Sequence, residues 1–137
     1  MPGFKTQRRV EFRDTDAAGI MHFSVFFAWM ESCEHEMLRD TGMSVMMADE
    51  DFVVGWPRVS ATCDFKSPVR FEDVVDVQIC VKKVGNKSAT YSVEFSHEGR
   101  EVAIGEIVAV CCEVREGKPP KAIVIPDEIR EKLSKYS

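Results

Sequence analysis

Apolar residues at a helical spacing define one long element near the beginning of the chain. Between about Phe23 and Asp40, at 100° per residue, seven apolar side chains fall within about 140° of arc. They are Phe23, Phe26, Phe27, Met30, Cys33, Met37 and Leu38. Glu34 projects within the same arc, and an unpaired buried carboxylate is costly, so Glu34 should have a partner. The pattern predicts a helix of roughly 18 residues, and Gly42 suits its C-terminal cap.

Most of the remaining apolar residues alternate with polar ones, as in half-buried strands. The alternating stretches are residues 9–13, 59–65, 75–82, 89–95 and 102–115. Short turns around residues 85–86 and 98–99 separate the later stretches, which is typical of an antiparallel meander. A short C-terminal helix is expected after Pro126, with acidic residues first and a basic residue last.

The order of these elements indicates the fold class. A strand is followed by the long helix and then by four strands, and the connections other than the helix are too short for parallel crossovers. An antiparallel sheet wrapped around one long apolar helix is the simplest arrangement that buries both. We therefore expect a single α+β domain over residues 1–137.

Composition and charge exclude several classes of protein. The chain is 45% hydrophobic, which excludes intrinsic disorder, and its net charge of −5 argues against non-specific binding to nucleic acid or anionic membranes. The longest stretch without Asp, Glu, Lys or Arg, residues 17–30, is too short for the roughly 20 residues that span a bilayer. The N-terminus has no apolar segment typical of a signal peptide. Five cysteines without a C-x-x-C pair fit a reducing cytoplasm.

The segment DTDAAGIMHF, residues 14–23, joins the first predicted strand to the long helix. The first turn of a helix presents unpaired backbone N–H groups and a partial positive charge. Beside a fixed carboxylate, such N–H groups can hold a developing oxyanion while the carboxylate attacks a carbonyl or activates water. The alternative is that Asp14 or Asp16 only caps a turn or the helix. The residues alone leave both interpretations open.

The run VEFRDTDAAGIMHFSVFFAWMESCEHEML resembles the signature of the 4-hydroxybenzoyl-CoA thioesterase family of hot dog-fold acyl-CoA thioesterases. The family pattern is Asp-x-Asp-x-x-Gly followed by a helix that carries an acidic residue; Asp14, Asp16, Gly19 and Glu31 match it. The resemblance continues through residues 59–65 and the hairpin at Lys87. It implies a hot dog fold, a homo-oligomer (a dimer or a dimer of dimers) with active sites at subunit contacts, and no cofactor.

The resemblance also implies roles for individual residues. In this family the second Asp of the motif is the catalytic carboxylate, which falls on Asp16. The backbone N–H at the start of the helix holds the thioester oxygen, and here it belongs to Phe23. Relatives usually carry Tyr or His at that place, whereas Phe23 has no polar side chain and His22 precedes it. Gly19 and His22 are expected beside the substrate.

Two further positions have competing interpretations. Glu31 either orients a polar acyl group, bridges to a partner subunit or lies on a solvated helix face. Relatives place basic residues at a sheet hairpin to meet the nucleotide phosphates of CoA; Lys87, with Lys82 and Lys83 nearby, either does this or belongs to an ordinary solvated hairpin. No metal is expected, because the His and Glu residues of the helix follow no known ligand spacing.

The implied activity is hydrolysis of an aromatic or short acyl-CoA thioester to the free acid and CoA. Asp16 either attacks the carbonyl directly or orients a water molecule. Close alternatives are an acyl-carrier-protein thioesterase and a dihydroxynaphthoyl-CoA hydrolase. An alternative of another class is a non-catalytic acyl-CoA-binding module, since fold alone does not establish activity.

Overall fold

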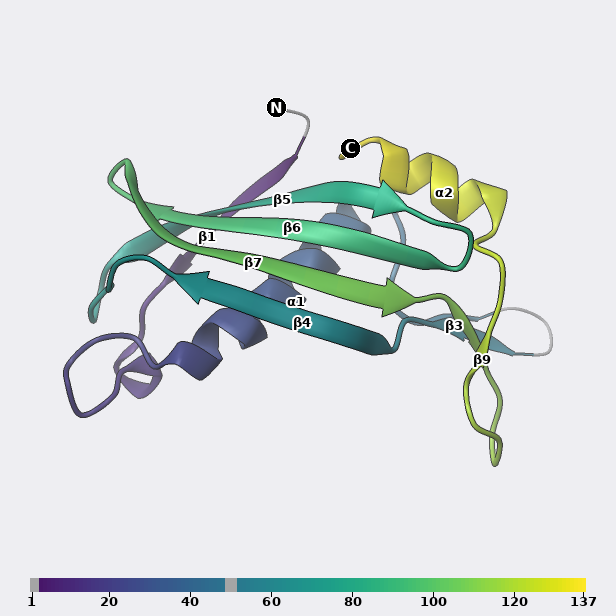
Figure 1. Cartoon of the computed structure of the whole chain (residues 1–137), viewed down its shortest axis with the longest axis horizontal. Helices are drawn as coiled ribbons and strands as arrows, with labels where there is room; N and C mark the ends of the chain where they lie inside the picture. The colour runs from purple at the N-terminus through teal and green to yellow at the C-terminus, as the bar shows by residue number, and fades with distance from the viewer. Residues whose placement is uncertain (1–2, 49–51) are drawn as a thin grey trace.

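The computed structural model describes residues 3–48 and 52–137 (Figure 1). In chain order its elements are β1 (Phe4–Arg9), the 3-10 helix η1 (Phe12–Asp14), α1 (Phe23–Asp40), β2 (Met47–Ala48), β3 (Val53–Gly55), β4 (Arg58–Phe65), β5 (Val74–Val84), β6 (Ser88–His97), β7 (Arg100–Val110), β8 (Cys112–Val114), β9 (Lys121–Ala122) and α2 (Asp127–Ser134). Within the described ranges, neither α1 nor α2 has the length and apolar character needed to cross a membrane.

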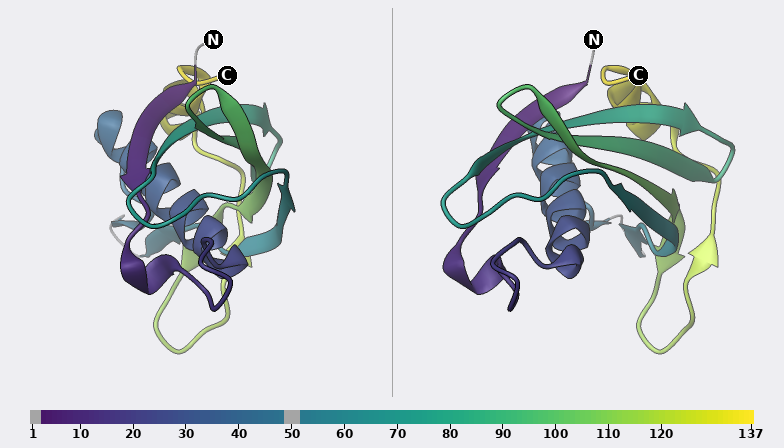
Figure 2. Two further views of the ribbon diagram at one scale, coloured as in Figure 1. Left: turned by 90° about the vertical axis from the view of Figure 1, so that its left-hand side faces the viewer. Right: turned by 60° about the vertical axis from the view of Figure 1, so that its left-hand side comes forward.

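The main sheet is antiparallel and has the strand order β1-β5-β6-β7-β4. The main sheet curves over one side of α1 (Figure 2). A smaller sheet with the strand order β2-β3-β8-β9 lies beyond one end of the main sheet. The apolar positions of β5 and β6 face the helix and are buried: Val75, Val77, Ile79, Val81, Ala89, Tyr91, Val93 and Phe95. The predicted α+β hot dog arrangement, an antiparallel sheet wrapped around one long central helix, is confirmed.

Helix α1 begins and ends at the predicted residues. At its end Gly42 has a φ of +82°, a conformation that glycine adopts without strain. Its buried residues are Phe26, Trp29, Met30, Cys33, Glu34, Met37 and Leu38. The predicted arc was wrong at its edge: Phe23 is 59% exposed and Phe27 is only partly buried, because the sheet curves past the helix without closing around it.

The strand predicted over residues 9–13 is wrong. β1 ends at Arg9 and the chain turns into η1, where the Asp14 carboxylate accepts a 2.8 Å hydrogen bond from the backbone N–H of Glu11. This local cap competes with extended backbone. The alternation also fails, since Val10 is fully buried whereas Phe12 is 77% exposed.

The predicted meander is confirmed for β5, β6 and β7, and β4 pairs with β7 at the far edge of the sheet. One expectation about these strands is corrected. The expected single strand over residues 102–115 is interrupted at Cys111. There the chain passes from the main sheet to the small one. The N–H of Cys111 donates to the Lys87 carbonyl, and the carbonyl of Cys111 accepts from the N–H of Ile123.

Edge strand β4 has no buried face in the isolated chain. Its apolar side was expected to be buried, yet Val59 is 63% exposed, Phe65 is 49% exposed and Ala61 is exposed. The strand is paired on one side only, so its other side presents free backbone groups.

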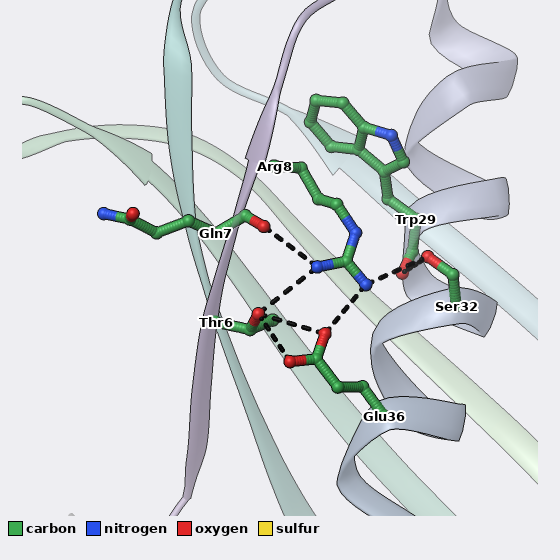
Figure 3. A network of polar contacts seen from close by, with 6 residues as sticks. All are labelled: Thr6, Gln7, Arg8, Trp29, Ser32 and Glu36. Carbon is green, nitrogen blue, oxygen red and sulfur yellow. Dashed lines mark hydrogen bonds and ion pairs between the residues drawn. The ribbon is translucent and has the colours of Figure 1, made fainter.

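A polar network ties β1 to α1 (Figure 3). The Arg8 guanidinium forms an ion pair with Glu36 at 3.0 Å and lies 3.4 Å from the Ser32 hydroxyl, while the Thr6 hydroxyl donates to Glu36 at 2.9 Å. Hydrogen bonds between charged groups are stronger than neutral ones. The network therefore fixes β1 against α1, and the loop between these two elements is held at both ends.

Candidate active site

The loop between η1 and α1 is closed by its own backbone. Thr15 and Met21 form an antiparallel bridge, and the Asp16 N–H donates to the carbonyl of Ile20 at 2.9 Å. The N–H of Gly19 donates to the Asp16 carbonyl at 3.0 Å, and Gly19 has a φ of +80°. A residue with a Cβ would be strained there. Gly19 therefore shapes the turn that carries Asp16.

The two aspartates of the motif differ in their surroundings. The Asp14 carboxylate caps Glu11, and its carbonyl accepts from the N–H of His22 at 2.8 Å, so Asp14 is a structural residue. Oδ1 of Asp16 accepts from the Ala18 N–H at 2.8 Å. Within residues 3–48 and 52–137 no hydrogen bond reaches Oδ2 of Asp16. One of its oxygens thus orients the side chain, and the other can act on a ligand.

The backbone N–H groups that open α1 are nearly all satisfied. The N–H of Met21 donates to the carbonyl of Val69 at 2.8 Å, and that of Ser24 donates to Nδ1 of the capping residue His22 at 3.2 Å. The N–H of Phe23, the first helical residue, has no acceptor in the described part of the chain. It is the donor that the start of this helix offers to a ligand.

Asp16 and Phe23 line the same pocket, which has a volume of about 370 Å³. Its complete lining is Asp16, Ile20, Met21, Phe23, Phe26, Phe65, Lys66, Ser67, Pro68 and Val69. The Phe65 ring centroid lies 5.2 Å from that of Phe26 and 6.4 Å from that of Phe23. A carboxylate, the start of a helix and three aromatic rings therefore meet around one cavity.

One wall of this pocket was not foreseen from the sequence. It comes from the end of β4 and from the connection of residues 66–73, whose Val69 carbonyl binds the Met21 N–H. No local signal identifies residues 66–69 as pocket residues. They reach the site because β4 and β5 lie on opposite sides of β6 and β7, so the chain between them must pass the start of α1.

Three other residues predicted to bind substrate, His22, Glu31 and Lys87, do not line this pocket. His22 caps α1, and its ring stacks on Phe23 at 4.7 Å. Glu31, about two turns along α1, lines a separate pocket of about 280 Å³ with Arg58. Lys87 belongs to the β5–β6 turn, and that turn lies at the opposite end of the sheet from the loop that precedes α1 (Figure 1). The 11 residues of β5 separate the two ends by roughly 35 Å. One chain does not bring Glu31 or Lys87 to Asp16.

Glu34 has the partner that its burial demanded. Its side chain is fully buried, and the Arg58 guanidinium binds both carboxylate oxygens, with Nη1 3.0 Å from Oε2. Burial raises the pKa of Glu34, and the positive charge of Arg58 opposes that rise. Arg58, at the start of β4, was not singled out from the sequence, because nothing local links it to a helix residue 24 positions earlier.

The pocket is suited to acyl transfer by a carboxylate. A carbonyl placed between the Phe23 N–H and the Asp16 carboxylate would meet a donor for its oxygen and a nucleophile or base for its carbon. A cysteine nucleophile is not indicated, since no cysteine in the described ranges lines this pocket, and burial raises the pKa of the Cys63 thiol, two residues before Phe65 on β4, to about 11. Among the described residues, no group of three or more His, Cys, Asp or Glu could hold a metal ion.

Comparisons with known proteins identify the family of the chain. The 4-hydroxybenzoyl-CoA thioesterase of Pseudomonas sp. is 28% identical over 137 residues, which is 93% of this chain and 95% of the relative. The acyl-CoA thioester hydrolase YbgC of Escherichia coli is 28% identical over 128 residues, 88% of this chain and 92% of the relative. The structure of BH1999 gentisyl-coenzyme A thioesterase superposes with a TM-score of 0.80 at 28% identity, covering 95% of this chain and 99% of that one. The sequence model described as thioesterase-like superfamily matches residues 10–133, and the chain belongs to this family.

Proposed function

We propose that the protein hydrolyses an aromatic or short acyl-CoA thioester to the free acid and CoA, with Asp16 as the catalytic carboxylate and the Phe23 N–H as the oxyanion donor. The observation that carries this proposal concerns two groups without a hydrogen-bond partner among the residues that the structure describes: Oδ2 of Asp16 and the N–H of Phe23 belong to residues lining one pocket. The named relatives, which act on acyl-CoA thioesters, support the substrate class.

Two routes lead from this arrangement to the same products. In the first, Asp16 attacks the thioester carbon, the carbon–sulfur bond breaks, and CoA leaves as a thiolate that solvent protonates; water then hydrolyses the mixed anhydride. In the second, Asp16 takes a proton from a water molecule that attacks the carbon directly; the carbon–sulfur bond then breaks, and CoA leaves as a thiolate that is protonated by Asp16 or by solvent. In both routes the carbonyl oxygen gains negative charge beside the Phe23 N–H.

The pocket lining supports an aromatic or short acyl group. The rings of Phe23, Phe26 and Phe65 provide apolar surface with edge-to-face and tilted contacts that suit a further ring. A relative of Synechococcus sp. named 1,4-dihydroxy-2-naphthoyl-CoA hydrolase is 28% identical over 138 residues, so a naphthoyl thioester belongs among the candidate substrates.

We also propose that two chains associate through β4 as a two-fold dimer, or as a dimer of such dimers. The exposed β4 edge lies beside the uncovered part of α1, where Phe27, Ala28 and Glu31 remain accessible around the pocket that Arg58 lines. Antiparallel pairing of two β4 edges would bury this surface and remove the open edge. The five free cysteines fit a cytoplasmic location.

Such a dimer gives a reason for the position of Lys87. A two-fold axis between paired β4 strands reverses the neighbouring chain, so the β5–β6 turn of the neighbour lies at the same end as Asp16. The nucleotide end of CoA would then be bound by one subunit and its thioester by the other. Mixed dimers of Asp16→Asn and Lys87→Gln subunits would contain one intact site each. We expect kcat/KM of the mixture to exceed the average of the two separate variants; an average value contradicts a shared site.

The catalytic proposal is tested by thiol release from a panel of benzoyl, hydroxybenzoyl, dihydroxynaphthoyl and short acyl thioesters of CoA and of acyl carrier protein. Asp16→Asn should lower kcat by at least about 100-fold, as expected for loss of a catalytic group. Asp14→Asn is the matched control and should keep kcat within a few-fold, because Asp14 acts only as a cap. Near-full activity of Asp16→Asn removes it from the mechanism. Ligand binding without thiol release would instead indicate a binding module.

A further inference from the structure

The β5–β6 turn has its carbonyl groups directed into the protein. The Asn86 carbonyl accepts from the Ile125 N–H at 3.0 Å, and the Lys87 carbonyl accepts from the Cys111 N–H at 2.7 Å. The guanidinium of Arg130 donates to the Gly85 carbonyl at 3.0 Å and lies 3.5 Å from the carbonyls of Val84 and Asn86. Cys111 and the segment of residues 125–130, both distant in sequence from the turn, therefore hold the negative ends of these peptide dipoles inside.

The outer side of the turn is correspondingly positive. In the part of the chain that the structure describes, the backbone N–H groups of Asn86 and Lys87 have no acceptor, and the side chains of Lys83 and Lys87 have no acidic partner. Successive free N–H groups in a turn form a concave site for an anion, and lysine side chains add full charges to it. The turn is thus locally electropositive on a protein whose net charge is −5.

Arg130 is the contact that spans the turn. It projects from α2, a helix anchored by the buried side chains of Ile129 and Leu133. A guanidinium has five donors in a rigid fork, so one side chain can bind several carbonyls at once, which a lysine ammonium on a flexible stem does less well. Arg130 has no ion pair with an acidic group among the described residues, so its charge also adds to the field of the turn.

We propose that Arg130 is a positioning residue for coenzyme A: it holds the β5–β6 turn in the conformation whose amides and Lys87 bind the phosphates of the CoA nucleotide. This inference rests on the proposed function, because it assigns a part of the substrate to a part of the chain. Arg130 does not contact the thioester. Its loss should therefore weaken binding of the nucleotide and leave the chemical step unchanged.

The test compares ligands with and without the nucleotide. Calorimetry should show that Arg130→Gln weakens binding of free CoA by about tenfold, in line with the loss of charge-assisted hydrogen bonds that hold an anion site. The same variant should raise KM for the CoA thioester and leave both kcat and the kinetics of the matching pantetheine thioester within twofold. Lys132→Gln is the control: it removes the same charge from the same helix, where Lys132 pairs with Glu128, and should change neither ligand's binding.

A double-mutant cycle addresses the mechanism of the effect. If Arg130 acts through the turn, Arg130→Gln and Lys87→Gln together should weaken CoA binding less than the product of the two separate effects. Arg130→Lys, which keeps the charge and loses the fork, should lie between the wild type and Arg130→Gln, and it provides a second variant if the glutamine protein folds poorly.

Three results would overturn the inference: unchanged CoA affinity in Arg130→Gln, equal losses for CoA and pantetheine thioesters, or failure of the wild type to bind CoA. Failure of the proposed function is a separate result, since it would show as an absence of thiol release from every thioester, whereas the CoA titration needs no hydrolysis.

Discussion

Replacement of Arg58 by methionine should be among the most destabilising single changes on the β4 edge. Arg58 is the sole partner of the Glu34 carboxylate in the described part of the chain, and Glu34 is fully buried between α1 and the sheet. Methionine keeps much of the volume of the arginine stem and removes the charge. The variant therefore leaves a carboxylate in the core without a cation or donor.

The expected loss follows from the burial of Glu34. Removing one partner of a buried ion pair costs about 3–5 kcal/mol, because the remaining charge is neither solvated nor paired. For a domain of this size, 1 kcal/mol corresponds to roughly 4 °C in Tm, so Arg58→Met should lower Tm by roughly 10–20 °C.

The loss should depend on pH. Burial raises the pKa of Glu34 and Arg58 opposes the rise, so the variant has a still higher folded-state pKa. A carboxyl whose pKa is raised by folding binds its proton more tightly in the folded state. The free energy of unfolding therefore falls as the pH increases from the unfolded-state pKa of Glu34 towards the folded-state pKa of Glu34. The difference in stability between wild type and variant should be larger at pH 8 than at pH 5.

Urea denaturation of the wild type, Arg58→Met, Glu34→Leu and the double variant, at one fixed protein concentration, measures these differences. The double variant replaces the pair with apolar side chains and should be close to the wild type or more stable. A loss below 1 kcal/mol for Arg58→Met, or a loss that is the same at pH 5 and pH 8, would refute this account of Glu34.

Other changes test the packing and the caps. Gly105→Ala should lower the free energy of unfolding by about 1–3 kcal/mol, since the added Cβ would lie 2.6 Å from Sδ of the buried Met30; thermal denaturation measures this, and Met30→Ala should relieve part of it. Tyr136→Phe should raise the pKa of Asp40, because the Tyr136 hydroxyl is the main cause of its lowered value; an unchanged carboxylate titration by NMR would contradict this. Asp14→Ala removes the hydrogen bond between the Asp14 carboxylate and the Glu11 N–H that caps η1, and it should lower the free energy of unfolding by about 1 kcal/mol in urea denaturation.

Periodicity was sufficient for the elements whose environment is uniform along their length. The 3.6-residue spacing predicted a helix from about Phe23 to Asp40, where α1 lies, since the apolar face of that helix packs on the sheet along most of its length. Alternation predicted β5 and β6 for the same reason. It failed over residues 9–13, where the local bond between Asp14 and Glu11 bends the backbone, and at β4, where alternation carries no information about which edge a strand joins.

For the candidate site, the residues alone identified the loop and left open whether either aspartate faces a ligand, and the family resemblance assigned the catalytic role to Asp16. Asp14 and Asp16 have the same side chain two positions apart, and only their partners distinguish them: a backbone N–H at η1 for the first, and a turn with a free oxygen for the second. The pocket wall from residues 66–69 and the roles of Arg58 and Arg130 follow from contacts between distant segments, so no spacing in the sequence could indicate them.

The amino-acid sequence by itself determined one long amphipathic helix, the alternating core strands and the family of the chain, because these depend on short-range spacing and on a contiguous motif. The tertiary structure decided which carboxylate lines the pocket, which cation neutralises Glu34 and why Lys87 lies far from Asp16 within one chain. The first outcome depends on the turn that presents Asp16, the second on the pairing of β4 with β7, and the third on the length of β5. The position of a strand in the sheet is set by long-range pairing that its own residues do not encode.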